Sequence, residues 1–78
     1  MSATGANEWD DAAPLLAQLQ RSTANGGVLV IKIDNERENG EVFTVVVSGT
    51  KYGGRFFRND GADLMSILRE ALAFCEGR

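Results

Sequence analysis

The spacing of apolar residues changes from a helical period to a strand period and back along the chain. The first periodic stretch is apolar at positions i, i+3, i+4 and i+7, the spacing of one helical face: Ala12, Leu15, Leu16 and Leu19. Asp10 before it and Pro14 in its first turn favour a helix start, and Asn25-Gly26-Gly27 favours its end. Trp9 could pack on this face from outside the cap. Residues 1–8 show no period and predict a disordered tail.

The middle of the chain predicts three strands. Residues 28–33 and 42–48 are rich in β-branched residues, residues 55–58 begin a shorter third strand, and Asn39-Gly40 is a strong hairpin signal. We expect one face of the sheet, the one that faces the helices, to carry Leu29, Ile31, Ile33, Phe43, Val45 and Val47. We expect the opposite face to carry Val28, Val30, Val42, Thr44 and Val46. Either Phe56 or Phe57 should point into the core.

A second amphipathic helix follows the strands. Asp60 is its expected N-cap, with Asp63 three residues on where an acid suits the helix dipole. Its apolar stripe comprises Leu64, Ile67, Leu68, Ala71, Leu72 and Cys75. Strands joined by short turns must be antiparallel, and both helices can cover one face of the sheet. The sequence therefore predicts an α+β two-layer sandwich in the order α-β-β-β-α, formed by residues 9–78 as a single domain.

The composition limits which stabilising and binding groups this protein can have. The 78 residues contain one cysteine, Cys75, and no histidine, so we expect no internal disulfide, no zinc site and no metal. Residues 1–7 do not resemble a signal peptide, and no apolar run is long enough for a membrane span. We therefore expect a soluble, cytoplasmic protein without a membrane partner.

The charge of the chain is unevenly placed around a net value of −3. Residues 34–41 hold four acidic residues against one arginine, whereas residues 51–58 hold three basic residues and no acid. The net charge gives no general attraction to nucleic acid, so any such attraction has to be local.

The order of elements over residues 10–76 resembles the double-stranded RNA-binding domain. The likeness is best from Phe43 onward: the strand 43–48, the glycine turn at Gly53-Gly54, a short third strand and an alanine-spaced helix. The resemblance implies the α-β-β-β-α fold. That family holds phosphates with a basic cluster at the start of its last helix, whereas residues 59–63 of this chain carry two acids and no base. No RNA-binding residue is therefore carried over.

The segment 51–58 interleaves basic and aromatic residues and has three interpretations. Lys51, Tyr52, Arg55 and Arg58 could anchor an acidic protein surface, or could bind single-stranded nucleic acid by stacking and phosphate contacts. The segment could equally be an exposed hairpin with one phenylalanine in the core.

The uncovered face of the predicted sheet is the second candidate. Val30, Thr44 and Val46 would offer apolar area to a protein partner or to a second copy of the chain. Alternatively, they are ordinary strand residues that happen to be exposed.

No group in the sequence points to catalysis. Cys75 lies on an apolar stripe without a histidine to activate it, and the acid pairs at 10–11 and 36–38 suit a helix start and a turn. We expect no enzyme activity and no cofactor. The function expected is a small binding protein of the inhibitor, immunity or adaptor type, and the alternative is a nucleic-acid-binding module that uses residues 51–58.

Overall fold

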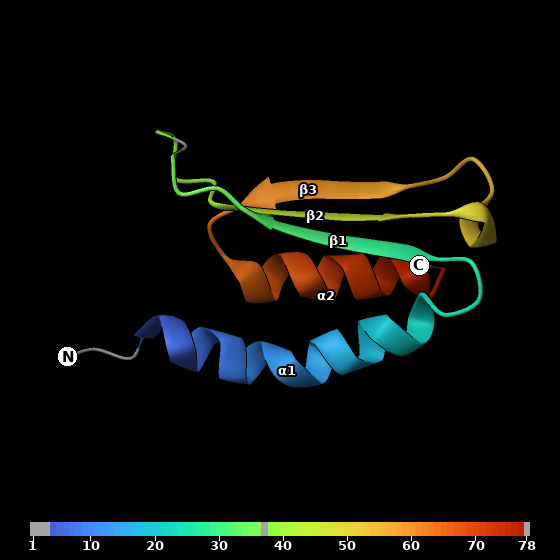
Figure 1. Cartoon of the computed structure of the whole chain (residues 1–78), viewed down its shortest axis with the longest axis horizontal. Coiled ribbons are helices and arrows are strands. Elements are labelled where there is room, and N and C mark those ends of the chain that lie inside the picture. Colours follow the sequence, from blue (N-terminus) through green and yellow to red (C-terminus); the bar gives the residue numbers. More distant parts are fainter. Residues whose placement is uncertain (1–3, 37, 78) are drawn as a thin grey trace.

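The computed structural model describes residues 4–36 and 38–77 of the chain. Its elements follow one another in the order helix, three strands, helix (Figure 1). They are α1 (Thr4–Ser22), β1 (Val28–Ile33), β2 (Phe43–Ser48), the short 3-10 helix η1 (Thr50–Tyr52), β3 (Phe57–Gly61) and α2 (Leu64–Cys75). The predicted α+β fold with the order α-β-β-β-α is therefore confirmed.

Helix α1 begins earlier than the sequence pattern predicts. The pattern placed its start near Asp10 with Pro14 in the first turn, but the helix runs from Thr4 and contains Pro14. An interior proline removes one N–H donor and crowds the carbonyl four residues earlier, which costs stability, but α1 nevertheless continues through Pro14. The extension carries Trp9 onto Phe43, with the ring centroids 6.3 Å apart and edge to face. The predicted tail 1–8 thus overlaps α1 at residues 4–8, and residues 1–3 lie outside the described residues.

The three strands form one antiparallel sheet in the order β1-β2-β3. The register pairs Val30 with Val46, and Val46 with Arg58. In this register, even-numbered residues of all three strands share one face and odd-numbered residues share the other. Val45 and Val47 are fully buried, so the odd-numbered face is the one that the helices cover, as predicted.

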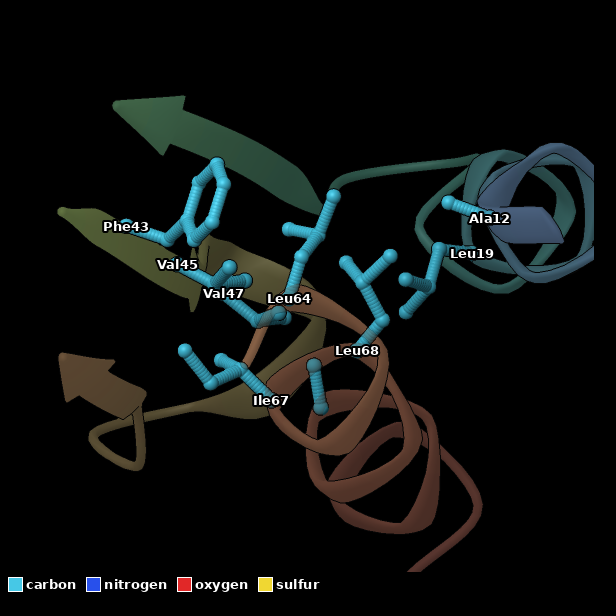
Figure 2. Close-up of a cluster of buried hydrophobic side chains, with 9 residues drawn as sticks. Ala12, Leu19, Phe43, Val45, Val47, Leu64, Ile67 and Leu68 are labelled. Carbon is cyan, nitrogen blue, oxygen red and sulfur yellow. The ribbon is translucent and has the colours of Figure 1, made fainter. Parts of the chain in front are cut away.

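The core lies between the helices and the odd-numbered face of the sheet (Figure 2). Its buried members are Ala12, Leu19, Phe43, Val45, Val47, Leu64, Ile67, Leu68 and Ala71. In Figure 2, Leu64 and Leu68 of α2 lie between the side chains of α1 and those of β2. Six of these nine residues lie on the two helices and three on β2. Both helices and the sheet therefore contribute to one contiguous core.

The boundary between β3 and α2 differs from the prediction. β3 extends through Asp60, and the N-cap of α2 is Asp63, whose carboxylate accepts a hydrogen bond from the Ser66 amide at 3.3 Å. The predicted cap at Asp60 is wrong. The Asp60 carboxylate instead accepts a hydrogen bond from the Thr44 hydroxyl at 2.6 Å, which fixes it beside β2. Such a cross-strand partner is invisible to a local capping pattern.

The two helices do not contribute equally to the cover of the sheet. α2 packs on β2 and β3, α1 packs mainly along α2, and neither helix packs extensively on β1 (Figure 1). Leu29 and Ile31 are consequently only partly buried, and Ile33 is 50% exposed. Ile33 thus lies on the helix side of the sheet, as predicted, but it remains exposed because the helices leave β1 thinly covered. Among the described residues, no helix has the length and apolar character to cross a membrane.

The loops at one end of the sheet meet in a close backbone crossing. The Lys51 amide donates a hydrogen bond to the Gly26 carbonyl at 3.1 Å, which holds the loop after α1 against the loop after β2. Gly49 has a φ of +117°, and a Cβ there would overlap the Gly26 carbonyl oxygen. The crossing therefore depends on glycine at position 49 for both conformation and space.

Candidate interaction surfaces

The helix-free face of the sheet is defined by the even-numbered strand residues. They are Val28, Val30, Lys32, Thr44, Val46, Ser48, Arg58 and Asp60. Pairing across the strands divides the face into two halves. One half is mainly apolar and holds the pair Val28–Ser48 and the row Val30–Val46, which ends at Arg58. The other half is polar and holds the row Lys32–Thr44–Asp60, and Arg58 lies at the border of the two halves.

The apolar half of this face is open to solvent. Val28 is 49% exposed and Val30 is 48% exposed, and Val46 beside them is partly buried. Phe56 is 65% exposed just before β3. Its neighbours Arg55 and Phe57 both contact Phe74 of α2, so alternation in an extended chain directs Phe56 away from the helices. The apolar half thus consists of Val28, Val30, Val46 and Phe56. No contact within the described chain accounts for the solvent exposure of these apolar side chains.

The polar half is internally satisfied. Thr44 is only 4% exposed, and its hydroxyl donates to Asp60. Arg58 lies on the other side of that carboxylate, with 3.6 Å between its guanidinium and Asp60 Oδ1. Lys32 Nζ lies 4.0 Å from Asp34 Oδ2. Thr44 therefore lies on the predicted face but offers a partner little surface, and Arg58 presents a partly neutralised charge.

The first part of the segment 51–58 turns back onto the ends of the helices. Lys51 Nζ donates hydrogen bonds to the carbonyl oxygens of Ser22 at 2.6 Å and Ala24 at 3.2 Å. These carbonyls lie at the end of α1, where the helix dipole is negative, so the ammonium group is well placed there. The Tyr52 hydroxyl donates to the same Ser22 carbonyl at 3.2 Å. Both side chains hold η1 to α1.

Aromatic rings gather around Phe74 near the end of α2. The Tyr52 ring lies 5.2 Å from it and the Phe57 ring 6.0 Å, measured between centroids. The Arg55 guanidinium lies over the Phe74 ring at 4.9 Å, a cation–π geometry. We call Tyr52, Arg55, Phe57 and Phe74 the Phe74 cluster. The sequence left open whether Phe56 or Phe57 points into the core. The structure shows that Phe57 packs inward, against Phe74, and that Phe56 is exposed.

The Tyr52 hydroxyl also lies 3.4 Å from Cys75 Sγ. Burial, the hydrogen bond with Cys75 and the charge that Cys75 can carry together raise the pKa of Tyr52 from 10.0 to about 12. The phenol is therefore neutral and acts as a donor throughout the physiological range. Among the described residues, no three His, Cys, Asp or Glu side chains gather where they could hold a metal ion.

The structure separates the predicted partner-binding residues into two groups. Val30, Thr44, Val46 and Arg58 lie on the helix-free face. Lys51, Tyr52 and Arg55 lie at the helix ends, where each makes an internal contact. Sequence reasoning left open which of Phe56 and Phe57 is exposed. It missed Ile33 as an exposed apolar side chain and Phe74 as the centre of the cluster. Ile33 is exposed because α1 packs on α2 instead of on β1. No local pattern in the sequence indicates that packing.

Comparisons of the chain with protein families, with curated proteins and with solved structures find no match. The order of elements and the antiparallel sheet agree with the topology of the double-stranded RNA-binding domain, to which the sequence shows a resemblance.

Proposed function

We propose that this chain is a non-catalytic binding protein that contacts a protein partner through the apolar half of its helix-free face. The observation that carries the proposal is the exposure of Val28 and Val30 on a surface that no element of the described chain covers, with Val30 paired to Val46. Phe56 is also exposed, just before β3. A large apolar side chain exposed singly is ordinary, but several on one small face are typical of an interface.

The surroundings of this half suit an interface with a polar rim. Arg58 and Lys32 border the valines, and both are exposed. Interfaces combine an apolar centre with a charged rim, which sets orientation more than affinity. An inhibitor, an immunity factor or an adaptor would each use a surface of this kind, and a cytoplasmic location would fit any of them.

The test is the substitution Val46→Glu. Val46 lies in the centre of β2 and points away from the core, so the fold should survive while a charge appears in the middle of the contact area. Gln20→Glu is the matched control, because it adds the same charge at an exposed position of α1. Both variants and the native chain would be used as baits in the native host, with circular dichroism to verify folding.

We expect the native chain and Gln20→Glu to capture the same partner and Val46→Glu to lose it. Capture that Val46→Glu leaves intact would contradict the proposal. Performing each capture with and without nuclease separates a protein partner from one bridged by nucleic acid.

The alternative is a nucleic-acid-binding module, and the topology is the observation that favours it. Against it, Lys51 is bonded to the end of α1, Arg55 lies over Phe74, and Asp63 occupies the start of α2. Binding of the phosphate backbone needs several basic side chains on one continuous surface. We therefore expect an RNA duplex titrated at about 150 mM salt to bind no more tightly than non-specifically. Sub-micromolar binding would favour the alternative, and Ala at Lys51, Arg55 and Arg58 should then flatten its salt dependence.

A further inference from the structure

The two edges of the sheet differ in how they are protected. β3 is an edge of five residues that carries Arg58, Asn59 and Asp60, with Asn59 hydrogen-bonded to Glu70 of α2 at 2.6 Å. β1 is the other edge, and its sequence is Val-Leu-Val-Ile-Lys-Ile. Natural edge strands avoid pairing with other chains through proline, bulges, charges or a covering element. β1 has one charge, no proline and an uninterrupted register with β2.

The hydrogen-bond pattern determines which backbone groups of β1 face outward. The Asp34 amide donates to the Val42 carbonyl at 2.8 Å, and these residues continue the β1–β2 register by one pair. The backbone of Asp34 is therefore directed to β2, and such positions alternate along an antiparallel ladder. Val28, Val30 and Lys32 use their backbone groups on β2. Leu29, Ile31 and Ile33 direct their N–H and C=O groups to the open edge.

The same three residues have incompletely covered side chains. Leu29 and Ile31 are partly buried and Ile33 is 50% exposed, because α1 packs along α2 and leaves the helix side of β1 thinly covered. Outward backbone groups and uncovered apolar side chains therefore coincide on Leu29, Ile31 and Ile33. A strand laid along this edge would satisfy both at once.

We infer that β1 pairs with β1 of a second copy of this chain, antiparallel and centred on Ile31. A two-fold axis perpendicular to the sheet keeps the helices of both copies on one side and requires that residues of equal parity face each other. Centred on Ile31, the register pairs Ile31 with its own copy and Leu29 with Ile33 in both directions. All three outward-facing residues then find partners, in three hydrogen-bonded pairs with two bonds each.

This register also suits the side chains. The pairs Leu29–Ile33 and Ile31–Ile31 are wholly apolar and lie on the helix side, where they extend the core. On the helix-free face Lys32 lies beside Val30 of the other copy, with its charge near Asp34 of its own chain at 4.0 Å. Its aliphatic stem can cover that valine while the ammonium group remains in water. The result is a continuous six-stranded sheet that closes at two copies.

The inference is independent of the proposed function, because it uses the edge of β1 rather than the helix-free face. The test measures the mass of the native chain by sedimentation equilibrium, up to about 1 mM, which covers the affinity that a small interface provides. We expect a monomer–dimer equilibrium without larger species. A monomer across this range, or an open series of larger oligomers, would overturn the inference.

Two variants locate the interface. Ile33→Lys places a charge opposite Leu29 of the second copy and should raise the dimer dissociation constant about tenfold or more. Val28→Lys is the matched control on the same strand, because Val28 is equally exposed, bonds to β2 and faces Asp34 of the other copy in this register. We expect it not to raise the dissociation constant, because a lysine at position 28 meets the Asp34 carboxylate of the other copy rather than an apolar side chain. Equal effects of the two variants would contradict the register.

Amide hydrogen exchange tests the pairing without any substitution, so it decides the question even where a variant fails to fold. The amides of Val30 and Lys32 should be protected at all concentrations. Those of Leu29, Ile31 and Ile33 should gain protection only as the dimer forms. Exchange at these three amides that does not depend on concentration, in a sample that sediments as a dimer, would place the contact elsewhere and overturn the inference.

Discussion

Tyr52 donates a hydrogen bond to the carbonyl oxygen of Ser22, 3.2 Å away and thirty positions earlier in the chain. The same hydroxyl touches Cys75 near the end of α2. One phenol thus joins η1 to the ends of both helices. This relationship changes the interpretation of the segment 51–58, since its first two side chains hold the fold together at this end of the molecule.

The stability of the protein should fall at alkaline pH through Tyr52. The folded pKa of about 12 exceeds the value of 10.0 for a free tyrosine. A raised pKa means that the fold favours the neutral phenol, so the contribution is complete below pH 10 and is lost as the pH rises through about 12. Tyr52 is the only tyrosine, so the ultraviolet absorbance of its phenolate reports this titration directly.

The controls for this titration are Tyr52→Phe and Cys75→Ala. Tyr52→Phe keeps the ring beside Phe74 and should remove this component of the alkaline loss of stability. Cys75→Ala removes both the hydrogen bond and the neighbouring charge, so the pKa of Tyr52 should move back toward its ordinary value. An unshifted Tyr52 pKa in the native protein would show that the phenol is solvated rather than buried beside Cys75.

Leu68→Ala should lower the free energy of unfolding by about 2–4 kcal/mol, because Leu68 is fully buried between α1 and the sheet and its loss leaves a cavity. Leu72→Ala is the control one turn later on the same helix, where the side chain is only partly buried, and it should cost less. Chemical denaturation monitored by circular dichroism measures both. Equal losses would mean that α2 is rotated relative to the structure described.

Gly49→Ala should destabilise the fold by about 2 kcal/mol or more, since alanine is strained at a φ of +117° and its Cβ overlaps the Gly26 carbonyl. Gly54→Ala provides the comparison in the same loop, because a Cβ there has no heavy atom within 4 Å. We expect it to change the free energy of unfolding by less than about 1 kcal/mol. A tolerated Gly49→Ala would show that the two loops do not cross closely.

Asp63→Ala should reduce stability by about 1 kcal/mol through loss of the hydrogen bond to the Ser66 amide. Asp63→Asn should be nearly neutral, because asparagine caps a helix about as well as aspartate. Urea titration of the two variants measures the difference. Equal behaviour of Ala and Asn at this position would indicate that the cap contributes charge rather than a hydrogen bond.

The sequence by itself determined the elements and their order. The 3.6-residue period of Leu64, Ile67, Leu68 and Ala71 and the β-branched runs of β1 and β2 are local signals, because side-chain direction follows directly from backbone geometry. The same alternation correctly put Val45 and Val47 in the core and Val46 on the other face.

Tertiary structure decided everything that depends on a partner far along the chain. Asp60 has the local signature of a cap, but the Thr44 hydroxyl holds it in β3 and leaves the cap to Asp63. Lys51 and Tyr52 have the composition of a binding segment, but carbonyl groups at the end of α1 bind them internally. Ile33 has the period of a core residue, but α1 packs along α2 and leaves it exposed. A local pattern specifies which way a side chain points, whereas only the packing of whole elements specifies what it meets there.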